Sequence, residues 1–261
     1  MNAAFEIGAT ALRAEQLALE VLANNVANVN TPSFKRSEAR FSEVLARTAI
    51  IENSAPEAGT PILRTPRSGG AGVRMVEQSM LFSQGELRRT GNPLDLAIEG
   101  QGLIELLGPA GEPRFWRGGT LRVNEDGLLA TVAGFPLRAG IIVPGDAETL
   151  AIAPDGVVTA TTSDGEALEI GQIGLVRFDR ESAMERLDEG LFRAAEGARL
   201  TDARPGEDGA GTLAQGSIEG SNVSLTEEMV QMLVVQRAFA ANAQIVQAAD
   251  QIAAITNNLK S

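Results

Sequence analysis

Long helical patterns occupy both ends of this 261-residue chain, and they limit how the rest of it can fold. At the N-terminal end, residues recur at alternating spacings of three and four, which is the a/d repeat of a coiled-coil seam. The repeat predicts a helix of about 40 Å with one apolar stripe. The stripe consists of Phe5, Gly8, Leu12, Glu15, Leu19, Leu22, Val26 and Val29, in which Gly8 and Glu15 are the weak points.

The C-terminal pattern begins at Ser224, which forms a capping box with Glu227. No Gly or Pro interrupts the chain after this point, and many positions are Ala, so other helices can approach closely. The pattern therefore predicts a long helix with a broad apolar face. This face consists of Met229, Met232, Val235, Phe239, Val246, Ala249, Ile252 and Leu259.

Between the helices, short apolar or alternating runs are separated by Asp-Gly pairs, which favour tight hairpin turns. These pairs are Asp126-Gly127, Asp155-Gly156, Asp164-Gly165 and Asp208-Gly209. The predicted class is α+β, with a mainly antiparallel central β domain and with the N- and C-terminal helices paired as a coiled-coil-like helical hairpin.

We expect four parts along the chain. They are an N-terminal helix (1–30), a turn followed by an extended Pro/Gly-rich arm (31–72), a β domain (73–220) and a C-terminal helix (221–261). A hairpin of two helices cannot bury apolar faces this wide, and isolated helices are marginal in water. The helices therefore lie on the β domain or pack against the same helices of other copies.

Asparagines are unusually frequent at the end of the first helical pattern, in the stretch LANNVANVNTPSFKR. A helix end explains one or two of them, because Asn tolerates the left-handed conformation and Pro32 disfavours helix at Thr31. Asn24, Asn25 and Asn28 lie inside the helical pattern, where Asn is a poor helix former. We interpret these three as amides at a seam between helices, where they fix the register.

The composition makes enzymatic chemistry improbable. The chain has no His, Cys or Tyr, so the usual general base, the commonest zinc ligands and every imidazole-dependent triad are missing. We expect neither a cofactor nor a metal. The net charge of −12 argues against a nucleic-acid partner, because phosphate binding depends on Lys and Arg.

The remaining motifs have simple structural explanations. Gly100-Gln101-Gly102 lacks the third glycine of a phosphate-binding loop and is better explained as a tight turn. Trp116 lies between two arginines and is either a cation–π surface contact or a core residue at a strand end. A β-rich adhesin or phage tail component, or a carboxylate-based hydrolase, are the other classes considered, but neither predicts matched terminal stripes with paired asparagines.

No apolar run approaches the roughly 20 residues that span a bilayer, so membrane insertion is not expected. The N-terminal residues also lack the basic and then apolar layout of a cleavable signal peptide. Composition alone favours the cytosol, unless export uses a different signal.

Three separated stretches resemble one family. LANNVANVNTPSFKRSEARFSEVL is similar to the N-terminal signature of the rod and hook axial proteins of bacterial flagella, in which Asn-Thr-Pro and an aromatic residue precede Lys or Arg. The resemblance continues through SQGELRRTGNPLDLAIEGQGLIEL and ends in GSIEGSNVSLTEEMVQMLVVQRAFAANAQIVQAADQI. It covers nearly the whole chain in the same order. Ser33-Phe34 depart from the family's frequent Gly-Tyr pair.

The resemblance implies a structural subunit that polymerises helically with copies of itself, so that the amides of Asn24, Asn25 and Asn28 would find their partners largely on other copies. The terminal helices would form an inner tube, the β domain would face outward, and the turn at Asn30, Thr31, Pro32, Phe34 and Lys35 would be the family's signature turn. The implied partners are neighbouring rod and hook axial proteins, the rings around the rod and the flagellar type III export apparatus. The implied location is the basal body, in the part that crosses the periplasm.

Overall fold

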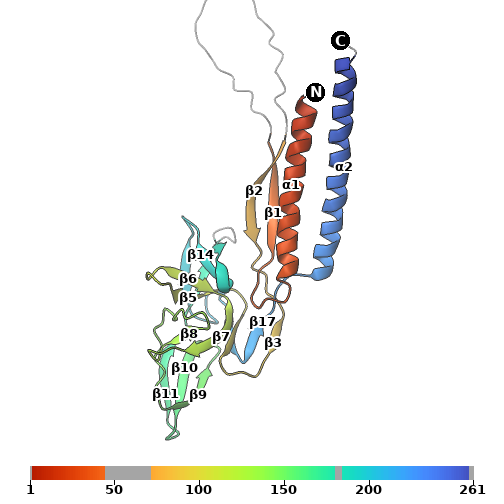
Figure 1. Cartoon of the computed structure of the whole chain (residues 1–261). Coiled ribbons are helices and arrows are strands. Elements are labelled where there is room, and N and C mark those ends of the chain that lie inside the picture. The colour runs from red at the N-terminus through yellow and green to blue at the C-terminus, as the bar shows by residue number, and fades with distance from the viewer. Residues whose placement is uncertain (1, 45–71, 180–183, 259–261) are drawn as a thin grey trace, which may run out of the picture. The chain divides into compact units, whose positions relative to one another are not determined.

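The chain forms two compact units in the computed structural model, which describes residues 2–44, 72–179 and 184–258 (Figure 1). One, here called the helical unit, comprises residues 1–24, 39–78 and 226–261. The other, here called the β unit, comprises residues 25–38 and 79–225. The chain therefore passes between the units four times, and every segment of the β unit is bounded by such a crossing.

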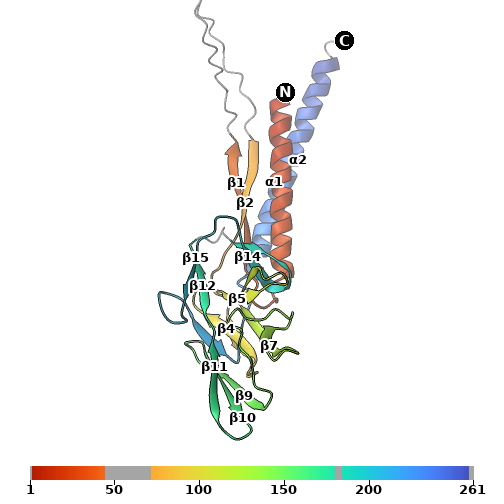
Figure 2. The same ribbon diagram turned by 90° about the vertical axis from the view of Figure 1, so that its left-hand side faces the viewer.

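Two long helices dominate the helical unit. They are α1 (Asn2–Ala27) and α2 (Leu225–Asn258), and they run antiparallel side by side (Figures 1 and 2). A β-carbon placed on Gly8 would lie 2.4 Å from Val246 Cγ2, so the backbone of α1 comes very close to α2 at this point. Glu15 lies seven residues further along α1, and its Oε1 accepts a hydrogen bond of 2.6 Å from Asn242 Nδ2 of α2. Neither described helix is long and apolar enough to cross a membrane.

A two-stranded sheet of β1 (Ser37–Val44) and β2 (Gly72–Met80) lies beside α1 (Figures 1 and 2). Strand β1 was not predicted, because residues 31–72 were expected to form a turn and an extended arm. The arm itself, between about residues 47 and 70, lies outside the described residues.

The β unit contains two four-stranded sheets and smaller ones. The first has the order β16-β4-β7-β8 (Thr212–Gln215, Asp95–Glu99, Gly118–Val123, Leu129–Thr131). The second has the order β13-β14-β6-β5 (Met184–Arg186, Leu191–Ala194, Pro113–Trp116, Ile104–Leu107). The smaller sheets are β11-β10-β9 (Ala167–Gln172, Val157–Thr162, Ala147–Ile152), β12-β15 (Leu175–Phe178, Leu200–Ala203) and β17-β3 (Ser217–Glu219, Leu87–Arg89).

Every strand pair of the β unit with a described register is antiparallel, which confirms the predicted α+β class with a mainly antiparallel β domain. Three of the four Asp-Gly pairs lie in turns between antiparallel partner strands, as predicted, whereas Asp208-Gly209 lies between β15 and β16, which belong to different sheets. Gly156, between β9 and β10, has a φ of +89°, and Gly165, between β10 and β11, has a φ of +82°. These left-handed conformations cost glycine little, so each pair turns the chain directly back.

Aliphatic side chains from several sheets fill the main core of the β unit, including Leu96, Ile98, Leu106 and Leu129, all fully buried. Trp116 belongs to this core and is 6% exposed, which decides the open question of its position in favour of the core residue. A second cluster gathers around Phe115 and Phe192, with Phe82 packed against it.

Gly8→Ala tests the contact between the two helices. Helix propensity alone would stabilise α1 by about 1 kcal/mol. The added methyl group must instead displace Val246, a stiff β-branched side chain, and overpacking typically costs about 1–3 kcal/mol. We expect a lower midpoint for the thermal loss of helical circular dichroism, recovered largely in Gly8→Ala/Val246→Ala. Gly174→Ala, where no atom lies within 4 Å, is the matched control. A stabilising Gly8→Ala would contradict the contact.

Candidate functional site

The carboxylate of Glu219 is fully buried, and Glu219 is the last residue of β17, shortly before α2 begins. Its Oε1 accepts hydrogen bonds from Lys35 Nζ at 2.6 Å and from the Gly85 amide at 2.8 Å. Its Oε2 accepts a hydrogen bond from Arg117 Nε at 2.7 Å. Lys35 follows α1 in the chain and Arg117 lies between β6 and β7, so one carboxylate joins three distant segments. We call Lys35, Arg117 and Glu219 the buried ion cluster.

The two cations also bind backbone carbonyl oxygens. Lys35 Nζ donates to the Ser83 carbonyl at 2.9 Å. The guanidinium of Arg117 donates to the Gly102 carbonyl at 2.6 Å and to the Gly100 carbonyl. The Gly100-Gln101-Gly102 turn, with φ of +109° and +133° at its glycines, therefore serves as an acceptor for an arginine.

Burial makes the members of this cluster interdependent. A buried charge without a partner is costly, and removing one member of a buried pair typically destabilises by about 3–5 kcal/mol. Burial lowers the pKa of Lys35, the nearby charge of Arg117 lowers it further, and Glu219 opposes both. Without Glu219, two like charges would remain buried together.

The signature turn lies next to this cluster. Ser33 has a φ of +57°, a left-handed conformation that is unfavourable for a residue with a side chain. Its amide donates to the Glu219 carbonyl at 2.8 Å, and its hydroxyl donates to the Gly118 carbonyl at 3.1 Å. The conformation explains why glycine is frequent here in the resembling family, since glycine adopts it without strain.

The next residue, Phe34, is buried, and the guanidinium of Arg186 lies 3.9 Å from its ring centroid. Arg186 also donates to the Lys35 carbonyl oxygen. Burial lowers the pKa of Arg186 to about 10, which leaves it protonated at neutral pH. The other predicted turn residues, Asn30, Thr31 and Pro32, are exposed.

Asn222 completes the connection between the N-terminal and C-terminal segments. Its Oδ1 accepts from the Arg36 amide at 2.6 Å, and its Nδ2 donates to the carbonyl oxygens of Leu81 at 2.8 Å and Ser83 at 3.0 Å. All of these groups belong to the β unit. The segments that lead from α1 and into α2 are thus fixed on the same part of it.

The expected partner of Asn25 is corrected by the structure. Its amide donates to the Ser37 carbonyl and accepts from the Ser37 amide, both at 2.9 Å, and the residue has no exposed surface. Asn25 therefore finds its partner in its own chain, because the chain turns back 12 residues later, and it is not available to another copy. Asn28 accepts from the Thr31 hydroxyl at 3.1 Å, within the turn, and Asn24 is exposed.

The predicted stripe residues occupy different surroundings. Leu22 is buried, whereas Leu12, Leu19, Val26, Met232, Val235, Phe239 and Val246 are half-buried. Met229 and Ile252 are exposed, by 55% and 59%. Phe5 lies in α1. Helix α2 starts at Leu225, so Ser224 precedes its first turn as predicted, whereas its reciprocal hydrogen bonds with Glu227 stay a prediction.

Lys35 was predicted from the sequence, whereas Glu219, Arg117 and Asn222 were not. One signal was present, because Glu219 is a lone acid in the otherwise small and apolar stretch GSIEGS before the helix. An acid in such surroundings suggests a buried partner. The pattern cannot say which of the 22 basic residues supplies it.

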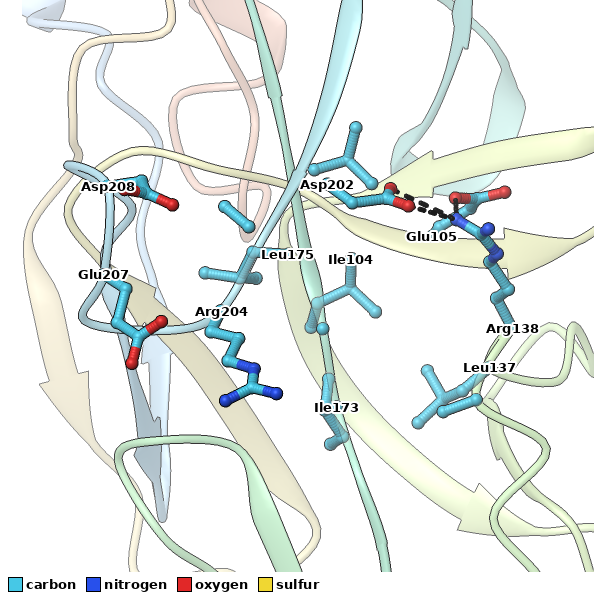
Figure 3. A pocket seen from close by; sticks show the side chains of 14 residues that line it. Ile104, Glu105, Leu137, Arg138, Ile173, Leu175, Asp202, Arg204, Glu207 and Asp208 are labelled. Carbon is cyan, nitrogen blue, oxygen red and sulfur yellow. Dashed lines mark hydrogen bonds and ion pairs between the residues drawn. The ribbon is translucent and has the colours of Figure 1, made fainter.

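A groove of about 490 Å³ lies elsewhere on the β unit (Figure 3). On its rim, Arg138 Nη1 contacts Glu105 Oε2 at 2.6 Å and Asp202 Oδ1 at 3.2 Å. The apolar side chains beneath, such as Ile104 and Ile173, are core residues with about 1% exposure. Arg138 is shared between the two acids, and exposed ion pairs of this kind contribute little. We assign no chemistry to the groove.

The buried ion cluster holds segments in place, which makes it a structural site. Three family models match the chain. "Flagella basal body rod protein" matches residues 5–35, "Flagellar hook protein FlgE/F/G D1 domain" matches residues 97–160, and "Flagellar basal body rod FlgEFG protein C-terminal" matches residues 214–259. Lys35 falls in the first match and Glu219 in the third.

Curated relatives match along the whole chain. Flagellar basal-body rod protein FlgG of Caulobacter vibrioides is 36% identical over 99% of both chains. FlgG of Agrobacterium fabrum is 34% identical over 98% of this chain and 99% of its own. Flagellar basal-body rod protein FlgF of Caulobacter vibrioides is 28% identical over 92% and 90%. The chain belongs to the flagellar basal-body rod protein family, as the resemblance predicted.

Glu219→Gln tests the buried ion cluster. The variant keeps the shape of the side chain but leaves Lys35 and Arg117 buried without a counter-charge, so we expect a loss of about 3–5 kcal/mol in the free energy of unfolding. Urea unfolding of the purified chain measures it. Glu207→Gln, an exposed acid in the same unit, is the matched control and should change stability by less than about 0.5 kcal/mol. Equal effects would contradict the assigned role.

Lys35→Met tests whether the pKa of Lys35 is lowered in the folded chain. Between the folded pKa of Lys35 and its ordinary 10.5, the unfolded chain binds more protons than the folded one, so the contribution of Lys35 to stability rises with pH in this window. We expect the unfolding free energy of the wild type minus that of Lys35→Met to increase as the pH rises towards 10.5. The chain has no Cys or Tyr, and Arg186, whose pKa of about 10 lies near this window, is present in both proteins, so its titration largely cancels in the difference. A constant difference would contradict the assignment.

Proposed function

We propose that this chain is a structural subunit of the distal rod of the bacterial flagellum. It polymerises helically with copies of itself into the drive shaft that transmits torque from the motor to the hook. The observation that carries the proposal is the similarity to FlgG proteins along 99% of the chain, which includes both helical ends. The higher identity to FlgG than to FlgF, 36% against 28% in the same organism, favours this type over the proximal rod or hook-type alternative.

The helices are proposed to form the polymer contacts, paired within each copy as a coiled-coil-like hairpin. Contacts at Gly8 and Val246 and at Glu15 and Asn242 support this pairing. The apolar residues proposed for the axial interface are Phe5, Leu12, Leu19, Leu22, Val26, Met229, Met232, Val235, Phe239, Val246 and Ile252, joined by Asn24 and Asn28. Several α2 side chains are more than half exposed, which leaves apolar surface for neighbouring copies.

The buried ion cluster is proposed to carry load from the helices to the β unit. Torque that acts on the helices must pass through the segments that connect them to the β unit. Lys35 and Glu219 lie in two of these segments, and a direct ion pair of 2.6 Å joins them. A connection made of buried ion pairs resists displacement, because separating the charges leaves each of them unpaired.

We also propose partners and a location for the chain. Its partners are neighbouring rod and hook axial proteins, the rings around the rod and the export apparatus. Its place is the basal body, in the rod that crosses the periplasm, which the chain reaches by type III export. A structural role also fits a chain without His or Cys, so we propose no enzymatic activity.

Deletion of this chain in its own organism tests the proposal. We expect purified basal bodies that keep the proximal part of the rod but lack its distal part and the hook, seen by electron cryomicroscopy. Expression of the wild-type chain should restore both. Complete rods in the deletion strain would contradict the proposed function, and loss of the whole rod would favour the proximal type.

A further inference from the structure

A second apolar stripe runs along α2, about a third of a turn from the residues that contact α1. Its members recur at spacings of three and four: Val230, Val234, Arg237, Ala241, Ile245, Ala248, Ile252 and Ile255. The stripe is exposed, with 55% of Val230, 57% of Val234 and Ile245, and 59% of Ile255 accessible. A row of exposed aliphatic side chains marks an interaction surface. We call it the outer stripe of α2.

Arg237 is the one charged residue in this stripe. It is exposed, and no carboxylate pairs with it among the described residues. When an apolar surface is covered, an arginine in its middle needs a carboxylate, because a desolvated charge without a partner is costly. The partner of the outer stripe should therefore carry an acid at one defined position.

Helix α1 has such an acid on the face that points away from α2. Glu15 marks the face towards α2, and Glu20 lies five residues further, which places it about 140° around the helix. Glu20 is exposed, as is Leu17 by 39% on the same outer face. Within the described residues Glu20 has no ion-pair partner either.

Glu20 and Arg237 also lie at the same height along the helix pair. The hydrogen bond between Glu15 and Asn242 fixes one level at which the antiparallel helices meet. Glu20 is five residues after Glu15, and Arg237 is five residues before Asn242. Because the helices run in opposite directions with the same rise per residue, both steps lead to the same level.

These complementary groups face away from each other in one copy, so they can meet only between copies. We propose that the outer stripe of α2 packs against the outer face of α1 of a second copy at the same level, with Arg237 paired to Glu20. Leu17 of that copy then covers the small gap at Ala241, one helical turn from Arg237. The inference rests on the proposed polymer and names one of its lateral contacts.

The proposed contact also fixes how neighbouring copies align along the helices. The repeated ion pair fixes the register between neighbours, as polar residues do in coiled-coil seams.

Charge reversal in the deletion strain tests this contact, read as the number of complete rods in purified basal bodies. Glu20→Arg and Arg237→Glu each place like charges together at every copy of the contact, so we expect the number of rods to fall by about tenfold or more. The double variant Glu20→Arg/Arg237→Glu should restore most of them. Coexpression of the two single variants should do the same, because alternating copies restore opposite charges at each contact.

Glu148→Arg, an exposed acid on β9, is the control with the same change in charge and should assemble like the wild type. Circular dichroism of each purified variant should show unchanged helix content, which separates a lost contact from a lost fold. The pair is wrong if the single variants assemble normally, or if both the double variant and the coexpressed pair stay defective. Either result leaves the proposed function intact, which fails only if the deletion strain itself builds complete rods.

Discussion

The carboxylate of Glu219 can remain buried and charged only while Lys35 and Arg117 both lie next to it. Lys35 is 184 residues from Glu219 in the chain, and Arg117 is 102 residues away. The fold must bring together the segment after α1, the strand before α2 and a central turn before any of the three charges is neutralised. Folding of the β unit and fixation of the two terminal segments are therefore coupled.

The chain has two sets of groups, one satisfied within a single copy and one that a single copy leaves exposed. The buried ion cluster, Asn222 and the turn at Ser33 are satisfied within one copy, so these segments can be ordered before assembly. The helices differ, because α2 keeps exposed aliphatic residues such as Val234 and Ile245 that a single copy does not cover. A rod subunit needs both properties. It needs a fixed connection to its β unit and an adhesive surface that only other copies complete.

Sequence patterns predicted what depends on local chemistry. The stripes predicted both helices, and Asp-Gly pairs such as Asp155-Gly156 predicted where antiparallel strands turn back. The interaction of Asn25 with Ser37 could not be predicted, because it depends on where the chain returns after the helix. The outer stripe of α2 was missed for a different reason. Two faces of that helix obey the same repeat, and a pattern alone does not say which face meets α1.

The central claim is that the buried ion cluster fixes the signature turn and the segment before α2 on the β unit in a single copy. Hydrogen exchange of the purified, unassembled chain tests this most directly, through the amides of Ser33, Ser37 and Gly85, which donate to Glu219 and Asn25. The account predicts that they exchange as slowly as amides of the core strand β4, because they open only when the β unit unfolds. Exchange as fast as that of the amides at the C-terminal end of α2 would contradict the claim.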